Sequence, residues 1–152
     1  MTVMHAHPRH IGDDEKLARS ARVSHWSPDQ PLHDPIDEWL PAVLGKLRRL
    51  MRPARTAYDL QATPDAVLQT LNLLSKIMST DTPPPTVVPR FGGGVQLEWH
   101  QNGIDLEIYV DADGSRAAWC FEEASHREWD AEGEALRFSA LRKELSLLSR
   151  HD

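Results

Sequence analysis

Four titratable side chains alternate along two short segments that flank an Asn-Gly pair at residues 102 and 103: Glu98, His100, Asp105 and Glu107. An Asn-Gly pair favours a two-residue type I′ turn, which would join the segments as antiparallel strands and place these side chains on one face. Carboxylates and an imidazole gathered in this way could hold a divalent metal, act as acid and base, or attract a cationic partner. The alternative is an ordinary solvated face of an antiparallel sheet.

Two turns predict the register of an antiparallel meander with strands over about 94–100, 104–110 and 115–121. The first turn places Glu98 opposite Glu107, and a second two-residue turn at Asp113-Gly114 would place Phe121 opposite Leu106. Because side chains alternate between the two faces, one face is expected to be an apolar core surface. Its predicted members are Val95, Leu97, Trp99, Leu106, Ile108, Val110, Trp119 and Phe121. The other face is predicted to carry Gln96, Glu98, His100, Asp105, Glu107, Tyr109, Ala118, Cys120 and Glu122.

Helical periodicity and capping signals predict helices over about 35–51, 64–79 and 134–149. The second has the clearest start, because Thr63 is a suitable N-cap and Pro64 suits the first helical position. The first contains Pro41, where a kink or a restart is expected.

The predicted elements add up to a single α+β domain over 35–150, in which two or three helices pack on one face of a three- or four-stranded antiparallel meander. The fourth strand would lie near 127–129, and the proline-rich run over 80–89 is interpreted as a stiff connector. Residues 1–34 mix His, Pro and charge without a period, and we expect a disordered or surface-draped tail there.

The composition of the chain limits the classes of protein to which it can belong. The chain has 152 residues, of which 26% are charged, and a net charge of −6. No apolar run approaches the roughly 20 residues of a membrane helix, and the first ten residues lack the pattern of a secretory signal. A single cysteine, Cys120, cannot form an intramolecular disulfide. These features predict a cytoplasmic protein of bacterial type, without a membrane partner.

Charge is divided unevenly along the chain. Between Pro41 and Leu60 five bases accompany one acid, a balance of +4, whereas eleven acids accompany two bases between Phe91 and Glu134, a balance of −9. An acidic sheet favours a basic protein partner. The residues predicted to bind that partner are Glu98, His100, Asp105, Glu107, Glu122 and Trp26. Trp26 is included because an aromatic side chain in a tail is suited to docking.

Two other functions compete with partner binding. The first is a small metal-dependent enzyme built on the carboxylates and the imidazole of the polar sheet face. The second is a weak DNA-binding accessory protein that contacts phosphates through Arg48, Arg49 and Arg52 of the first helix. We find no pattern that identifies a catalytic residue, a metal-ligand set or a cofactor.

The stretches TAYDLQATPDAVLQTLNLLSKIM and TPPPTVVPRFGGGVQLEWHQNGIDLEI resemble a group of small uncharacterised bacterial proteins. That group has a Trp-Asp-x-Tyr-Gly-Ala-like entry to a helix, a proline-rich connector and a GGVQLEW hairpin, and the likeness spans roughly 35–150. Here the helix entry reads AYDLQA at 57–62, which departs from the group's pattern. The resemblance implies the fold and a bacterial setting, with no site residues.

These observations predict a non-enzymatic interaction module, of the antitoxin or immunity type, that binds a basic protein through its acidic sheet face. Nucleic acid is expected only through the partner or the first helix. A homo-oligomer is compatible with the sequence.

Overall fold

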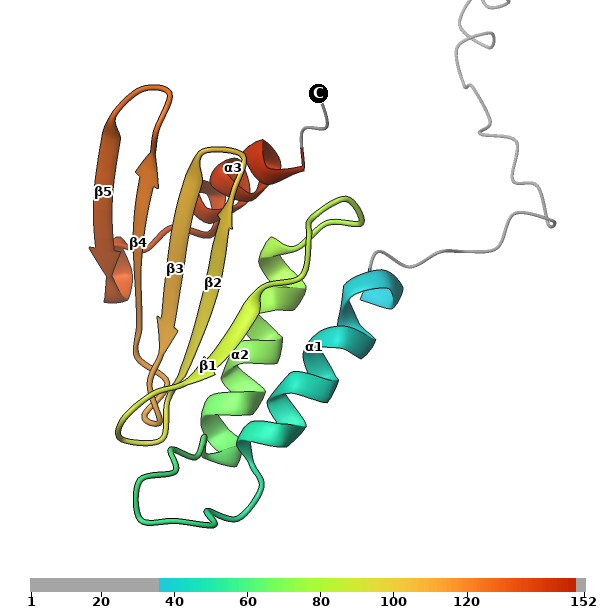
Figure 1. Ribbon diagram of the computed structural model, residues 1–152. Coiled ribbons are helices and arrows are strands. Elements are labelled where there is room, and N and C mark those ends of the chain that lie inside the picture. Colours follow the sequence, from blue (N-terminus) through green and yellow to red (C-terminus); the bar gives the residue numbers. More distant parts are fainter. Residues whose placement is uncertain (1–35, 150–152) are drawn as a thin grey trace, which may run out of the picture. The chain divides into compact units, whose positions relative to one another are not determined.

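The computed structural model describes residues 36–149, with side chains from Trp39 onward, and contains an α+β domain (Figure 1). Three helices accompany one five-stranded antiparallel sheet of order β1-β2-β3-β4-β5. The helices are α1 (Ile36–Leu50), α2 (Pro64–Ile77) and α3 (Phe138–Leu148), and the strands are β1 (Thr86–Pro89), β2 (Val95–Gln101), β3 (Ile104–Val110), β4 (Arg116–Glu122) and β5 (Arg127–Glu132). The α+β class and the antiparallel sheet are confirmed, whereas the predicted count of three or four strands is too low. The predicted tail over 1–34, including Trp26, lies outside the described residues.

Local chemistry sets the helix ends. Thr63 caps α2, since its Oγ1 accepts a hydrogen bond from the Ala66 N–H at 3.1 Å, and Pro64 is the first helical residue. The backbone becomes extended at Met78 (φ −78°, ψ 147°), so α2 ends two residues earlier than expected. α1 continues through Pro41 as a single helix. None of the helices in residues 36–149 combines the length and apolarity needed to cross a membrane.

The first hairpin has the register that its turn predicts. Asn102 and Gly103 both have positive φ angles, of 54° and 69°, as a type I′ turn requires. Glu98 therefore pairs with Glu107, and His100 pairs with Asp105.

The second hairpin corrects the predicted register by one residue. The backbone N–H of Asp111 donates to the Ser115 carbonyl at 2.9 Å, and the backbone N–H of Gly114 donates to the Asp111 carbonyl at 2.9 Å. Gly114 has a φ of 84°. The loop thus has three residues, closed by a glycine in the left-handed region, in place of the predicted two. A one-residue shift exchanges the two faces of a strand. Cys120 therefore pairs with Leu106 and is buried in the core, whereas Trp119 lies opposite Glu107 on the other face.

The two outer strands were only partly anticipated. β1 lies in the segment interpreted as a connector, and it pairs with β2 through Thr86 opposite Glu98 and Pro89 opposite Val95. β1 is an edge strand, where the missing donor of a proline is tolerated. β5 is longer than the fourth strand expected near 127–129, and it follows a turn in which His126 has a φ of 52°.

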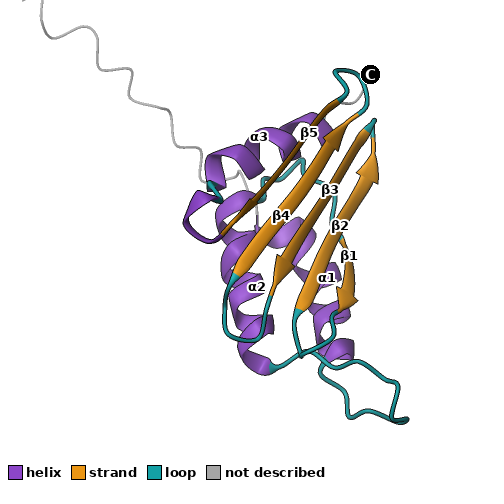
Figure 2. Ribbon diagram, turned by 90° about the vertical axis from the view of Figure 1, so that its left-hand side faces the viewer, coloured by secondary structure: helices purple, strands orange, loops and turns teal. Residues whose placement is uncertain are grey.

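The core lies between the helices and the inner face of the sheet. Figures 1 and 2, which differ by a 90° rotation, both place α1, α2 and α3 on the same side of the sheet. Leu47, Leu74 and Leu145 of these helices are fully buried together with Leu97 and Ile108 of the sheet. Burial of each such side chain contributes about 1.5–3 kcal/mol. No described element covers the opposite side of the sheet, which we call the open face.

Candidate binding face of the sheet

Strand pairing defines the side chains of the open face row by row. Its members on β1 to β5 are Thr86, Val88, Gln96, Glu98, His100, Asp105, Glu107, Tyr109, Ala117, Trp119, Phe121, Glu128, Asp130 and Glu132. Six of these residues are acidic. The fifth strand contributes three acids that the predicted face did not include, because its extent was not expected.

The facing carboxylates Glu98 and Glu107 share a neutral donor. The side-chain amide of Gln96 donates to Glu98 Oε1 at 2.8 Å and to Glu107 Oε2 at 3.2 Å. The Tyr109 hydroxyl also donates to Glu107 Oε2. Burial and this hydrogen bond raise the pKa of Tyr109 to about 12, so the hydroxyl keeps its proton. Like charges opposite each other across strands destabilise a sheet, and these donors offset that repulsion.

His100 lies between two carboxylates at one end of the open face. Its Nδ1 is 2.9 Å from Asp105 Oδ1, and its Nε2 is 3.7 Å from Glu98 Oε2. The hydrogen bond to Asp105 raises the pKa of His100, against a smaller opposing effect of desolvation. Protonated His100 would partly neutralise this end of the face.

Two aromatic residues lie among the acids, and the predicted register missed both. Trp119 is flanked across the strands by Glu107 and Asp130, and its indole N–H donates to Glu128 Oε1 at 2.7 Å. Phe121 is the neighbouring aromatic on the same strand face. The local sequence offers only a partial signal for this register, because the glycine of Asp-Ala-Asp-Gly-Ser suits the third position of a three-residue loop and its Asp-Gly pair equally suits a two-residue turn.

Arg90 is held at the β1 edge of the sheet. Its guanidinium lies 4.7 Å from the centroid of the Tyr109 ring and forms an ion pair with Asp111, with Nη1 2.5 Å from Oδ1. This arginine is therefore already engaged by an aromatic ring and a carboxylate outside the six acids of the open face.

Glu122 does not belong to the open face, contrary to prediction. It lies opposite Ile104 on the helix side, where Arg127 Nε is 3.3 Å from its Oε2. Ser125 donates to the same oxygen at 2.5 Å, and this bond, followed by the contact with Arg127, lowers the pKa of Glu122. Cys120 is also on the helix side, and burial raises the pKa of its thiol to about 12, which removes the thiolate needed for nucleophilic chemistry.

The remaining predicted residues divide between two places. Arg48 and Arg49 of α1 and Arg52 beyond it are exposed, and they lie outside the open face. The predicted carboxylates and imidazole share the open face, but His100 Nδ1 is bonded to Asp105. Across residues 36–149, no group of three or more His, Cys, Asp or Glu side chains is arranged to hold a metal ion.

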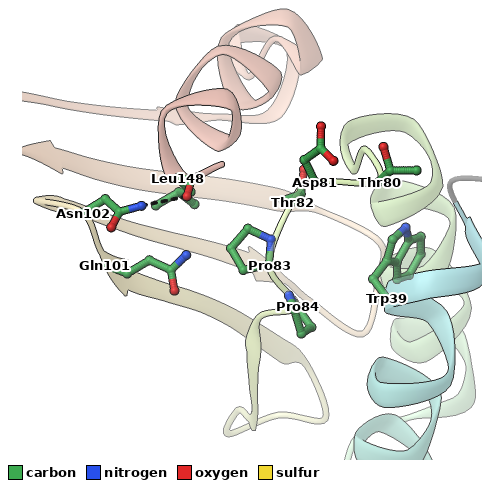
Figure 3. Close-up of a pocket in the computed structure, with 9 residues that line it drawn as sticks. All are labelled: Trp39, Thr80, Asp81, Thr82, Pro83, Pro84, Gln101, Asn102 and Leu148. Carbon is green, nitrogen blue, oxygen red and sulfur yellow. Dashed lines mark hydrogen bonds between the residues drawn. The ribbon is translucent and has the colours of Figure 1, made fainter. Parts of the chain in front are cut away.

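Two cavities border the end of the sheet that carries the β2–β3 turn. One, of about 550 Å³, adjoins the open face and includes His100, Asp105, Phe121, Glu123 and His126 in its lining. The other, of about 600 Å³, is shown in Figure 3. It is lined by Trp39, Thr80, Asp81, Thr82, Pro83, Pro84, Gln101, Asn102 and Leu148. Asp81 is its one acidic residue, and the Asn102 amide is already bonded to the Leu148 carbonyl at 2.8 Å, so this lining lacks paired acid and base groups.

Comparison of the chain with protein-family models, with curated proteins and with solved structures finds no match.

Proposed function

We propose that this protein is a non-enzymatic interaction module that binds a basic protein partner through the open face. The observation that carries the proposal is the arrangement of six carboxylates around Trp119 and Phe121 on a sheet face that no described helix covers. A sheet face that carried only acids would be an ordinary solvated surface. Aromatic rings among them add the contact area and the cation-binding character that protein interfaces use.

The chemistry of the face suits arginine and lysine side chains. A guanidinium stacked on the Trp119 ring would gain a cation–π contact of about 0.5–2 kcal/mol, and Glu128 and Asp130 flank that ring. The paired carboxylates Glu98 and Glu107 would gain a cationic partner at the centre of the face. Such complementarity accelerates association and fixes the orientation of the partner.

The antitoxin or immunity type is the class of module that this proposal favours. A protein of that class neutralises a partner by covering its functional surface, and a basic functional surface requires an acidic cover. The open face supplies its charge from regular strands, so the carboxylates are held in place before the partner arrives. Preorganisation of this kind lowers the entropy cost of binding.

The proposal can be tested by isothermal titration of the full chain with an octa-arginine peptide at about 50 mM salt. Asp130→Lys changes an exposed acid on the open face, and Glu134→Lys makes the same charge change on the exposed turn before α3. We expect Asp130→Lys and Trp119→Ala each to weaken binding by at least fivefold, and Glu134→Lys to have a much smaller effect. Equal effects of the two charge reversals, or full binding by Trp119→Ala, would contradict the proposal.

A further inference from the structure

A groove of about 460 Å³ lies beyond the end of α1, where the α1–α2 loop meets the end of β1. The lining residues important to its chemistry are Arg49, Arg52, Arg55, Tyr58, Leu60 and Pro89. In Figure 1 the loop and the β1–β2 turn lie at the same end of the sheet, and Thr63 donates to the Gly93 carbonyl of that turn at 2.8 Å. We call this feature the basic groove.

Internal hydrogen bonds shape the exposed loop that forms the basic groove. The Asp59 carboxylate accepts from the backbone N–H groups of Arg55 and Thr56, at 2.6 and 2.9 Å, and from the Thr56 hydroxyl at 2.9 Å. Ala62 donates to the Leu50 carbonyl at 3.0 Å and closes the base of the loop. These hydrogen bonds therefore define the conformation of the loop that forms the groove.

The charge of the basic groove is almost entirely from arginine. Asp59 is the one acid between Pro41 and Leu60, and its carboxylate is occupied by the loop's own donors. Lys46 donates to the Pro85 carbonyl at 2.6 Å. Arg49, Arg52 and Arg55 are exposed. Guanidinium groups bind phosphate oxygens in a bidentate manner that a lysine cannot match.

An aromatic side chain, that of Tyr58, is exposed beside these arginines. Tyr58 is 93% exposed, so the surrounding chain leaves its ring accessible. Phe91, in the adjacent β1–β2 turn, is 91% exposed. A ring with this exposure is accessible to a ligand that can stack on its face.

We propose that the basic groove binds single-stranded nucleic acid, with phosphates on Arg49, Arg52 and Arg55 and an unpaired base stacked on Tyr58. Arginine contacts along the backbone combined with aromatic stacking are the general mode of single-strand binding. A duplex shields the base faces that Tyr58 would need. A lipid surface offers phosphates but no base to stack on the ring, and an acidic peptide would make no comparable use of the ring. This site is separate from the open face and goes beyond the function proposed for that face.

The test is fluorescence anisotropy of a labelled twelve-nucleotide oligo-dT with the full chain, measured over a series of salt concentrations. We expect Tyr58→Ala to weaken binding at least about fivefold without changing its salt dependence, because stacking involves no ion release. The double variant R52Q/R55Q should reduce the slope of log K against log salt by about 1.4. Arg137→Gln, which changes an exposed arginine before α3, is the control and should bind like the natural chain.

Three results would overturn the proposal. One is the absence of oligo-dT binding at about 50 mM salt and 100 μM protein, where even weak nonspecific binding is measurable. Another is unchanged binding by both Tyr58→Ala and R52Q/R55Q. The third is more effective competition by a twelve-residue poly-glutamate peptide or a matched duplex than by unlabelled oligo-dT, which would assign the groove to an acidic protein or to double-stranded DNA. Circular dichroism of each variant confirms that the fold is retained.

Discussion

Replacing Arg127 with alanine would leave the carboxylate of Glu144, between α3 and the sheet, without its cation. Arg127 Nη2 lies 2.8 Å from Glu144 Oε1, and Glu144 is 1% exposed. The other oxygen, Oε2, is buried and has no hydrogen-bond partner among the described residues. The single ion pair therefore offsets most of the desolvation cost of this carboxylate.

The size of the effect follows from this geometry. Removing one partner of a fully buried pair costs about 3–5 kcal/mol. The Arg127 side chain is 39% exposed, so water screens the pair and can approach the carboxylate after the change. We therefore expect Arg127→Ala to lower the free energy of unfolding by about 2–3 kcal/mol, out of the roughly 5–15 kcal/mol typical of a domain.

Urea unfolding followed by far-ultraviolet circular dichroism measures this change. Glu122→Gln is the matched control, because it removes the second carboxylate bound to Arg127 while retaining the pair with Glu144, and it should lower the free energy of unfolding clearly less than Arg127→Ala does. Adding Glu144→Gln to Arg127→Ala should recover part of the loss, since a neutral amide needs no cation. A cost for Arg127→Ala no larger than that of Glu122→Gln would show that the ion pair with Glu144 does not stabilise the fold.

Three further predictions concern two glycines, the core thiol and the open face. Gly45→Ala, in the middle of α1, should raise the free energy of unfolding by about 0.5–1 kcal/mol, because the added Cβ would meet no atom within 4 Å apart from the neighbouring backbone of its own helix. Gly114→Ala, at φ 84°, should lower the free energy of unfolding by about 1–2 kcal/mol, and urea titrations would show both changes. Cys120, which is buried and has its pKa raised to about 12, should react with iodoacetamide at about pH 8 only after unfolding, as mass spectrometry would detect. The raised pKa of His100 means that its protonated form stabilises the fold below about pH 6.5 and that this contribution is lost as the pH rises through the folded-state pKa. The difference in unfolding free energy between the natural chain and His100→Gln should therefore be larger at about pH 6 than at about pH 9, and an equal difference at both would contradict the assigned contact with Asp105.

Local signals predicted the parts of the fold that depend on a few adjacent residues. Thr63 and Pro64 determine where α2 begins, and Asn102 with Gly103 determines the pairing of β2 with β3. In each case the backbone conformation is set by the residues named, so no distant contact was needed to predict it.

The remaining errors arise from choices that tertiary contacts decide. A loop that contains Asp113 and Gly114 can be closed with two or three residues, and burial of Cys120 rather than Trp119 selects the longer loop. β1 was not expected as a strand because of its prolines, yet an edge position accommodates Pro89. One consequence is that Glu122 was placed on the open face and Trp119 was omitted from it.

The corrected register changes which side chains accompany the acids on the open face. The predicted face was a group of acids beside a cysteine, which differs little from a solvated surface. The observed face combines Glu98 and Glu107, bridged by the Gln96 amide, with Trp119 and Phe121 beside them. The aromatic residues are the feature that makes a protein partner a specific proposal.

The most direct test of partner binding at the open face is a two-dimensional ¹⁵N NMR titration of the full chain with an octa-arginine peptide. The indole N–H of Trp119, bonded to Glu128, gives its own resonance at the centre of the face. We predict that the largest shifts will occur at this indole and at the backbone amides of Glu107 and Phe121, with little change at Tyr58 in the basic groove. Shifts of equal size over the whole acidic surface, or an unmoved Trp119 indole at saturation, would contradict the account.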